Sequence, residues 1–377
     1  MCFGPPNRRC GPDRNSLPMF LPNTGGHPQP HWAFFVPEFT PVARPRDRHC
    51  HTKEMVESLV VAVVGPTAAG KSDLSVALCK QLPGEVVNAD AMQVYRGMDV
   101  GTAKITPAER SGVPHHLLDI LDVTQTATVA DFQQLARAAI DDCLSRQMVP
   151  VLAGGSGMYV RAILDDFEFP GTDPEVRGRL EAELEEHGSG ALHVKLAAVD
   201  PASALKILPS NGRRIVRALE VIEITGGPYG ATLPEHTYVY PGAVQLGLDV
   251  PRPVLDERIG RRVDRMFENG FVDEVKDLLG KGLLDGVTAH RALGYSQVIA
   301  MLKGELSEAE ARERTAQTTR RFARRQDGWF RRDPRITWLP WDAPDLVDQA
   351  LRVVRGNHPA PAGVVGVEGL GAVDARG

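Results

Sequence analysis

One octapeptide constrains this chain more than any other feature: residues 65–72 read GPTAAGKS. This is the pattern G-x-x-x-x-G-K-[ST] of a phosphate-binding loop, in which backbone N–H groups and the lysine hold phosphate and the last hydroxyl can bind Mg²⁺. An apolar, β-branched run precedes it at 59–64, and a run of helix formers follows at 73–81. The octapeptide thus lies between a buried strand and a helix, which argues against a turn that matches the pattern by chance. The three elements together predict an α/β core that binds a diphosphate or triphosphate.

The composition is that of an ordinary globular chain. Its 377 residues suffice for two modest domains or one large domain with an insertion, and 42% are hydrophobic. No apolar run approaches the roughly 18 residues of a membrane span, and a net charge of −5 means that any nucleic-acid surface must be local. None of the five cysteines has C-x-x-C spacing, and the pair His115-His116 lacks further ligands. We therefore expect neither a zinc site nor disulfides. We expect a structural role for the two histidines and a cytoplasmic protein with no membrane partner.

Further strands are predicted at 85–87, 149–153 and 244–250, with helical segments between them. This alternation predicts the fold class α/β: a P-loop NTPase-like parallel sheet flanked by helices, with a helical insertion domain. The second strand ends just before Asp90, and the third runs into a glycine turn, Gly154-Gly155-Ser156-Gly157. Both features therefore lie at the carboxyl edge of the sheet, where open parallel sheets bind ligands. Asp90 is either a functional carboxylate at this edge or a helix N-cap.

The character of the sequence changes along the chain and predicts its domains. Ten of the 29 prolines fall in the first 50 residues, which indicates disorder, although translation starting at Met55 would explain the same segment. The predicted parts are a disordered N-terminal extension (1–54), a P-loop α/β catalytic core (55–166 plus 242–342), a helical insertion (167–241) and a mostly mobile C-terminal tail (343–377). Within that tail, 346–354 has a helical pattern.

A long helix, predicted from the capping box at 307–310, is dense in arginine. Nine arginines fall between 312 and 335, against three acidic residues. At helical spacing four of them form one line, here called the arginine stripe: Arg314, Arg321, Arg325 and Arg332. Arginine suits the geometry of phosphate, so the stripe predicts a nucleic-acid surface, and a solvated basic face is the alternative.

Several motifs together resemble one family, the tRNA dimethylallyltransferases, also called tRNA isopentenyltransferases. The resemblance covers residues from about 60 to 339 without a large gap. The motifs are GPTAAGKS (65–72), NADAMQVYRGMDVGTAK (88–104), PHHLLD (114–119), VLAGGSGMYV (151–160), RRIVRALEV (213–221), RALGY (291–295) and RRQDGWFRR (324–332). The bacterial form is implied, because the C-terminal zinc finger of the eukaryotic relatives has no counterpart here.

The resemblance implies a reaction and the residues that perform it. A dimethylallyl group passes from dimethylallyl diphosphate to N6 of adenosine 37, beside the anticodon of a tRNA. Asp90 matches the family's general base, and Ser156 stands where the family contacts the target nucleotide. The cofactor implied is Mg²⁺, held by Ser72. The diphosphate-binding residues implied are Gly65, Pro66, Thr67, Ala68, Ala69, Gly70, Lys71, Ser72 and Arg262.

The matched motifs also imply contacts with the anticodon stem-loop of tRNA, made by a monomer. The target base must leave its stack to reach the donor. The tRNA-binding residues implied are Asp90, Ala91, Met92, Gln93, Ser156, Arg177, Arg213, Arg214, Ile215, Val216, Arg217, Arg291, Ala292, Leu293, Gly294, Tyr295 and Ser296. One departure is Ala91, where many relatives have serine, which removes a hydroxyl beside the expected base.

Two other functions are compatible with parts of the sequence. A small-molecule or nucleoside kinase that uses ATP would explain the phosphate loop, but not the arginine stripe or the insertion. A non-catalytic RNA-binding protein on a P-loop fold would explain the stripe. The second alternative predicts that loss of the Asp90 carboxylate leaves RNA binding intact and changes nothing else.

Overall fold

The computed structural model describes residues 59–230 and 236–357 of the 377 in the sequence. The predictions for residues 1–54 and for a start at Met55 lie outside the described residues, as does the chain beyond 357. Among the helices of the two described ranges, none combines the length and the apolar character that crossing a membrane requires.

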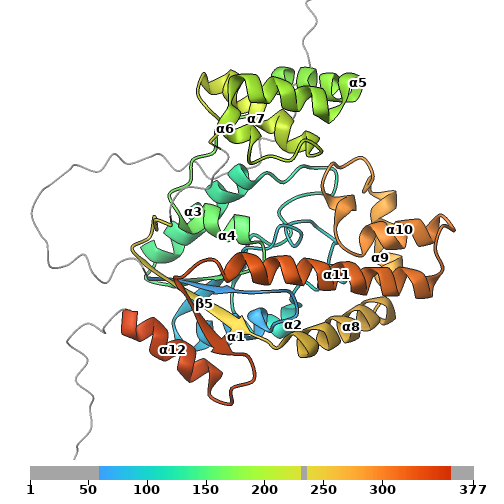
Figure 1. Ribbon diagram of the computed structural model, residues 1–377. Helices are drawn as coiled ribbons and strands as arrows, with labels where there is room; N and C mark the ends of the chain where they lie inside the picture. The colour runs from blue at the N-terminus through green and yellow to red at the C-terminus, as the bar shows by residue number, and fades with distance from the viewer. Residues whose placement is uncertain (1–58, 231–235, 358–377) are drawn as a thin grey trace, which may run out of the picture. The chain divides into compact units, whose positions relative to one another are not determined.

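In these ranges one six-stranded sheet forms the core, and all its strand pairs are parallel (Figure 1). The strand order is β3-β2-β4-β1-β5-β6, which puts the first strand between β4 and β5. Val61 of β1 pairs with Val151 on one side and with Val244 on the other. The strands are β1 (Leu59–Val64), β2 (Gly84–Asn88), β3 (His115–His116), β4 (Val149–Ala153), β5 (Gly242–Asp249) and β6 (Ile336–Pro340). The predicted parallel α/β fold is confirmed.

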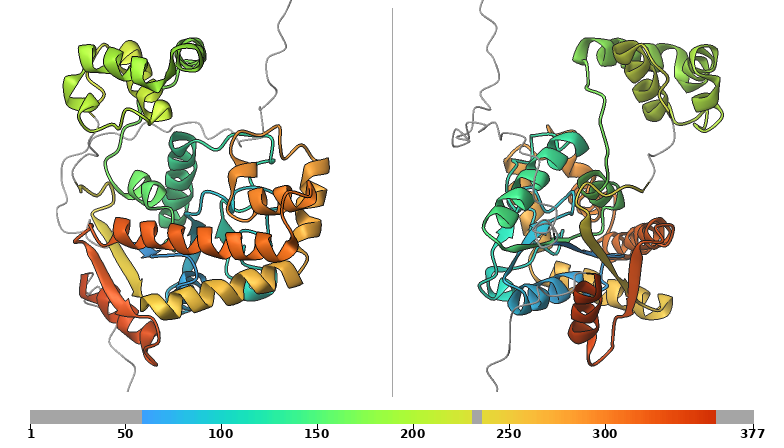
Figure 2. Two further views of the ribbon diagram at one scale, coloured as in Figure 1. Left: turned by 45° about the vertical axis from the view of Figure 1, so that its right-hand side comes forward. Right: turned by 90° about the vertical axis from the view of Figure 1, so that its left-hand side faces the viewer.

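Helices cover both faces of the sheet. Alternate side chains of each strand point to opposite faces, so both faces have apolar side chains that helices must bury. Val61 and Val63 pack against α1 and α12, whereas Val60 and Ala62 belong to the core formed with α3, α4 and the helices from α8 to α11. Figure 2 shows α8 and α11 running side by side. The helices of this core are α1 (Lys71–Gln81), α2 (Pro107–Arg110), α3 (Val129–Ser145), α4 (Gly157–Leu164), α8 (Arg252–Glu268), α9 (Phe271–Gly280), η1 (Ala289–Arg291), α10 (Tyr295–Leu302), α11 (Glu308–Phe330) and α12 (Leu346–Asn357).

The phosphate loop turns sharply between β1 and α1. Gly70, the N-cap of α1, has a φ of 104°, in the left-handed region that favours glycine. Ala68 has a φ of 66°, a conformation that is strained for a residue with a side chain. Strained backbone of this kind gathers at ligand sites, where the surrounding structure holds it in place.

The described part of the insertion consists of helices joined by irregular segments, and it has a small core of its own. Its helices are α5 (Pro174–Val199), α6 (Pro201–Ala204) and α7 (Gly212–Thr225). The side chains of Asp173 and Asn211 cap α5 and α7. The first of these helices, α5, has a kink at Gly188, where φ is 78°, and the chain resumes helical geometry beyond it. Leu180, Leu192 and Ile215 are fully buried in this core.

The C-terminal boundary predicted at 343 is wrong. The helix expected at 346–354 is present as α12, and it packs against α1, β5 and β6 instead of belonging to a mobile tail. Ala350, Leu351 and Val354 are buried in the same cluster as Leu78 of α1. The α/β core therefore extends through α12, because that helix packs beside α1 on the same face of the sheet.

Candidate active site

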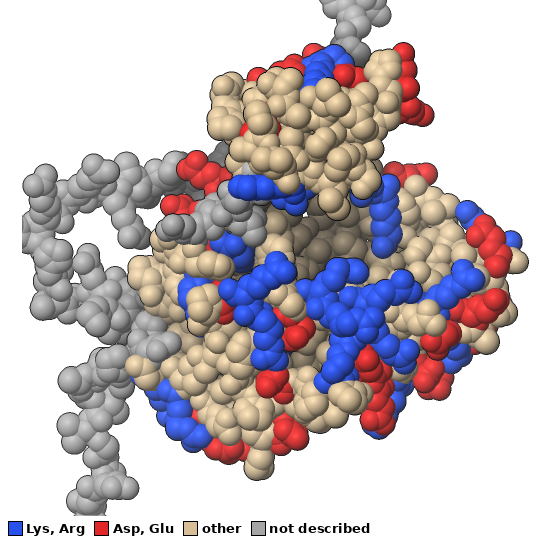
Figure 3. Space-filling model, in the orientation of Figure 1, with Lys and Arg blue, Asp and Glu red and all other residues tan. Residues whose placement is uncertain are grey.

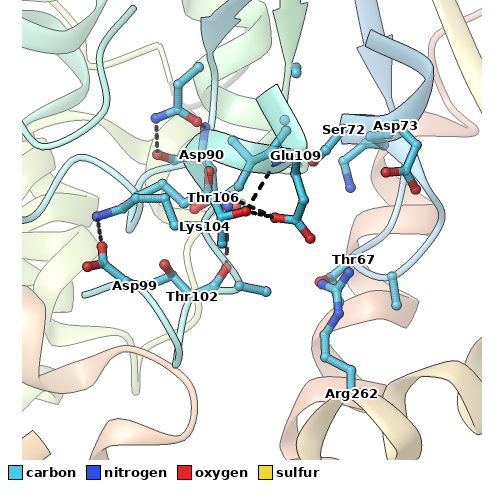
Figure 4. Close-up of a pocket in the computed structure, with 18 of the residues that line it drawn as sticks. Thr67, Ser72, Asp73, Asp90, Asp99, Thr102, Lys104, Thr106, Glu109 and Arg262 are labelled. Atoms are coloured by element: carbon cyan, nitrogen blue, oxygen red, sulfur yellow. Dashed lines mark hydrogen bonds and ion pairs between the residues drawn. The ribbon is translucent and has the colours of Figure 1, made fainter. Parts of the chain in front are cut away.

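A cavity of about 640 Å³ opens at the carboxyl edge of the sheet (Figure 4). Three parts of the chain line it: the phosphate loop, the segment 99–106 that follows β2, and α8. Asp90 and Gly154, which follow the ends of β2 and β4, also reach it. The residues predicted at this edge from strand ends alone are thus brought together around one space.

The phosphate loop and α8 bring two cationic side chains to one wall of the cavity. Lys71 Nζ donates to the carbonyl oxygen of Pro66 at 2.8 Å, and Arg262 Nη1 donates to the Thr67 hydroxyl at 3.1 Å. Burial and, next, the charge of Arg262 lower the pKa of Lys71 to about 8, against the opposing effect of the Asp90 charge. Burial likewise lowers the pKa of Arg262. A bound anion such as diphosphate would relieve this crowding of positive charge.

Asp90 is held at the edge of the cavity by hydrogen bonds to two residues close to it in the chain, Asn88 and Met92. Its N–H donates to Asn88 Oδ1 at 2.9 Å, and Asn88 Nδ2 donates back to the carbonyl oxygen of Asp90 at 3.1 Å. One carboxylate oxygen, Oδ1, accepts from the N–H of Met92 at 2.9 Å. Within the described part of the chain, Oδ2 has no hydrogen-bond partner. The carboxylate is therefore fixed through one oxygen and keeps the other available to take a proton.

Ser156 lies beside Asp90 and not in the cavity lining. Its hydroxyl accepts from the N–H of Ala91 at 3.3 Å, so it ties the glycine turn to the Asp90 segment. Gly154 is needed for the same approach, because a Cβ there would overlap the backbone of Ala89. The prediction that Ser156 contacts the target nucleotide stays a prediction, and the contact to Ala91 is an additional one that the sequence did not indicate.

The segment 99–101 is held by a carboxylate that sequence reasoning missed. Glu274 of α9 accepts from the backbone N–H groups of Asp99, Val100 and Gly101 at 2.9, 2.6 and 3.0 Å, and from the hydroxyl of Tyr295 at 2.6 Å. Successive N–H groups around one anion form a nest. Since Val100 lines the cavity, Glu274 shapes one of its walls.

Ser72 is suited to hold Mg²⁺, as the resemblance implied. Its side chain lines the cavity, is exposed and has no hydrogen-bond partner in the described ranges (Figure 4). A hydroxyl is a hard oxygen ligand, and Mg²⁺ usually takes one or two protein oxygens together with water and substrate phosphate. The exposed hydroxyl of Ser72 therefore fits Mg²⁺.

Among the described residues, one other group has the spacing of metal ligands: Glu85, His116 and Cys143. Arg146 already forms a two-pronged ion pair with Glu85, at 2.7 and 2.8 Å, and His116 Nε2 lies 2.6 Å from the same carboxylate. Burial raises the pKa of Cys143 to about 12, so its thiol stays protonated. The cluster is an ion-pair network in which His116 has a structural part, whereas His115 lies outside it and lines the cavity.

The residues implied as tRNA contacts differ in how far their side chains are exposed. The side chains of Ile215, Val216, Ala292 and Tyr295 are buried in hydrophobic cores and serve packing, so a contact of these four residues with tRNA would have to come from their backbone, and their predicted tRNA binding stays a prediction. Arg177 of α5 binds the fully buried Glu220 of α7 at 2.5 Å and so joins the two helices, and Arg217 of α7 binds the same carboxylate at 2.8 Å. The exposed residues of the set are Arg213, Arg214, Arg291 and Ser296.

Three members of the arginine stripe are exposed on α11, and the fourth, Arg332, is exposed in the turn after the helix, which ends at Phe330. None of the four members forms an ion pair within the described residues, whereas Arg331 pairs with Asp249 and Asp327, and Arg335 pairs with Asp165 and Asp333. The space-filling view shows basic side chains gathered over this side of the molecule (Figure 3). The opposite side of the helix is buried and includes Ala323 and Phe330.

The fold and the site together define a class: a parallel α/β P-loop protein whose phosphate loop and two crowded cations lie next to a carboxylate. Comparisons with known proteins give the particular family. The family model described as IPP transferase matches residues 93–333. The tRNA dimethylallyltransferase of Thermobifida fusca is 66% identical over 302 residues, 79% of this chain and 94% of that relative. The one from Streptomyces avermitilis is 65% identical over 289 residues, 77% and 92% of the two chains.

Solved structures agree with these relatives. The tRNA isopentenylpyrophosphate transferase of Bacillus halodurans is 41% identical with a TM-score of 0.60, covering 80% of this chain and 96% of that one. A eukaryotic dimethylallyltransferase, solved acting on tRNA, is 26% identical with a TM-score of 0.70, covering 78% of both chains. The chain belongs to the IPP transferase family, the tRNA dimethylallyltransferases, and the predicted family is confirmed.

Proposed function

We propose that this chain transfers a dimethylallyl group from dimethylallyl diphosphate to N6 of adenosine 37 in tRNA, giving N6-(dimethylallyl)adenosine and diphosphate. The observation that carries the proposal is that one cavity has a cationic diphosphate cradle, Lys71 with Arg262, and the carboxylate of Asp90. The relatives' printed names supply the acceptor, tRNA.

The donor side of the site stabilises a leaving group. As N6 forms a bond to C1 of the dimethylallyl group, the bond from C1 to the diphosphate oxygen breaks and its electron pair leaves with the diphosphate. Lys71 and Arg262 are placed to neutralise that charge, and the Thr67 hydroxyl is oriented by Arg262. Mg²⁺ bound at Ser72 would supply further positive charge to the leaving group.

The acceptor side removes a proton. The exocyclic amine of adenine is a weak nucleophile because its lone pair is delocalised into the ring. Asp90 takes the N6 proton as the new bond forms, through the oxygen that its backbone neighbours leave unbound. The base reaches the site only when it is flipped from its stack, and the exposed arginine stripe is the surface proposed to hold the tRNA backbone.

The decisive experiment is incubation of the protein with unmodified tRNA, Mg²⁺ and labelled dimethylallyl diphosphate, followed by nucleoside analysis. Label in N6-(dimethylallyl)adenosine supports donor, acceptor and reaction class together. No label, with phosphorylation of a small molecule from ATP instead, would mean that the phosphate loop serves a kinase. Binding of tRNA without turnover of either donor would favour a non-catalytic RNA-binding protein.

A further inference from the structure

One buried polar side chain on α11 plays no part in the mechanism described above. Gln326 is 6% exposed and lies on a helix whose outer side is covered with arginine. A buried amide must satisfy both its donor and its acceptor, because an unpaired one loses its hydration without compensation. The partners of Gln326 therefore say what the residue is for.

Both partners belong to the active site. Gln326 Oε1 accepts from the backbone N–H of Thr67 at 2.8 Å, and Gln326 Nε2 donates to the carbonyl oxygen of Gly155 at 2.8 Å. Thr67 is in the phosphate loop, and Gly155 is in the glycine turn after β4. One amide group thus bridges the two loops that follow neighbouring strands of the sheet.

The neighbouring turn of α11 packs against the same glycine turn. Trp329, three residues further on, lies on the same side of the helix as Gln326. A Cβ on Gly157 would overlap the Trp329 indole, and a Cβ on Gly155 would overlap the Gln326 amide. The buried side of α11 is therefore fitted to the glycine turn, and glycine at these two positions is what permits the fit.

The glycine turn also contacts the segment that carries the catalytic carboxylate. Ser156 Oγ accepts from the N–H of Ala91, next to Asp90, at 3.3 Å. On the other side, Thr67 receives the hydrogen bond from Arg262. A continuous set of contacts then runs from the diphosphate cradle through Gln326 to the general base.

We propose that Gln326 is a positioning residue that fixes the spacing between the phosphate loop and the glycine turn, so that donor and acceptor meet at Asp90. The proposal rests on the proposed function for its kinetic consequence only. A misplacement of about 1 Å at a reacting centre can cost about 10²-fold in rate without changing what binds. Gln326 lines the cavity, but its amide oxygen and nitrogen are both engaged by the two loops, so its loss is expected in kcat more than in affinity.

The test uses two variants of the full chain and one control. Gln326→Leu removes both hydrogen bonds. Gln326→Glu keeps the acceptor for Thr67 but places an oxygen against the carbonyl of Gly155, so it breaks one bond only. The control is Gln349→Leu on α12, a glutamine that bonds Asp345 and lies outside the cavity lining.

Hydrogen exchange measured by mass spectrometry reads the two loops separately. In Gln326→Leu we expect faster exchange in peptides of both the phosphate loop and the glycine turn, and in Gln326→Glu in the glycine turn alone. The kcat of Gln326→Leu should fall about 10²-fold, with affinities for donor and tRNA within about threefold of the parent. The control should match the parent in all readouts.

Three results would overturn the inference: unchanged exchange in both loops, an unchanged kcat, or faster exchange spread equally over the insertion and α12, which would indicate general destabilisation. If the unaltered protein transfers no prenyl group, the proposed function fails by itself. The loop-specific exchange pattern then still decides whether Gln326 joins the two loops.

Discussion

At the scale of single residues, Asp90 carries the strongest chemical prediction. Asp90→Asn keeps the size and the hydrogen bond to Met92 but cannot accept the N6 proton. We expect kcat to fall by about 10²–10⁴-fold, the usual contribution of a general base, with tRNA affinity within about threefold of the parent. Single-turnover assays and tRNA binding measure the two quantities separately.

The control for this variant is Asp345→Asn, an aspartate on the surface that pairs with Arg352. It should leave turnover unchanged. A mild effect of Asp90→Asn, comparable to that of the control, would remove Asp90 from the role of base.

Lys71 makes a second prediction at this scale, in the pH dependence of donor binding. Because burial and Arg262 lower its pKa to about 8, the ammonium is charged below that pH and neutral above it. Affinity for dimethylallyl diphosphate, measured by calorimetry without tRNA, should be level up to about pH 8 and then weaken by up to about tenfold per pH unit. Lys71→Arg keeps its charge and should bind without this decline. Affinity that stays level to about pH 10 in the parent would contradict the assignment.

At the scale of elements, the nest around Glu274 joins α9 to the wall of the cavity. Glu274→Ala leaves three backbone N–H groups and the Tyr295 hydroxyl without their shared acceptor. We expect a loss of about 2 kcal/mol in the free energy of unfolding, kept modest because Asp99 is exposed and water can reach its N–H. Turnover should fall at least about tenfold, because Val100 and Thr102 line the cavity.

Asp277→Ala is the matched control for that variant, since Asp277 lies on the same helix and is exposed. Denaturant unfolding and a turnover assay compare the two. Equal effects of both substitutions would show that the nest does not determine the shape of the cavity.

The elements also show how far sequence reasoning reaches. The phosphate loop, the strands around it and the capped helices were predictable because their signals are local: a glycine pattern, an apolar run, a capping side chain. Gln326 and Glu274 were missed because each acts on a segment far away in the chain, 259 residues for Thr67 and 174 for Val100. A partial signal existed for Gln326, since helical spacing places it with Ala323 and Phe330 on the buried side of α11.

Motif resemblance has a different limit, seen in the insertion and in the RALGY segment. It located the right stretches of chain but could not separate residues retained for packing from residues retained for binding. Ile215 and Tyr295 are fully buried, and Arg217 serves the buried Glu220, while Arg213 beside them is exposed. Burial depends on which face of a helix meets its neighbours, which the motif does not state.

At the scale of the whole molecule, α11 separates two tasks by face. Its buried side holds the loops of the active site through Gln326 and Trp329, and its exposed side presents the arginine stripe. The same helix therefore links the surface proposed for tRNA to the position of the catalytic groups. On this proposal, one rigid element with both roles would hold tRNA in a fixed relation to the donor.

This arrangement predicts how tRNA binding responds to salt. Each arginine that neutralises a phosphate releases counterions, so its removal lowers the slope of log affinity against log salt concentration by about 1. Replacing both Arg321 and Arg325 by alanine should therefore lower the slope by about 2 and weaken binding most at low salt. Arg331→Ala is the matched control, because that arginine is already paired with Asp249 and Asp327 and should change the slope little. Filter binding across a salt series gives the slopes. If the paired arginine proves as important as the unpaired two, the tRNA backbone does not follow the stripe, and the exposed arginines of the insertion, Arg213 and Arg214, become the next candidates.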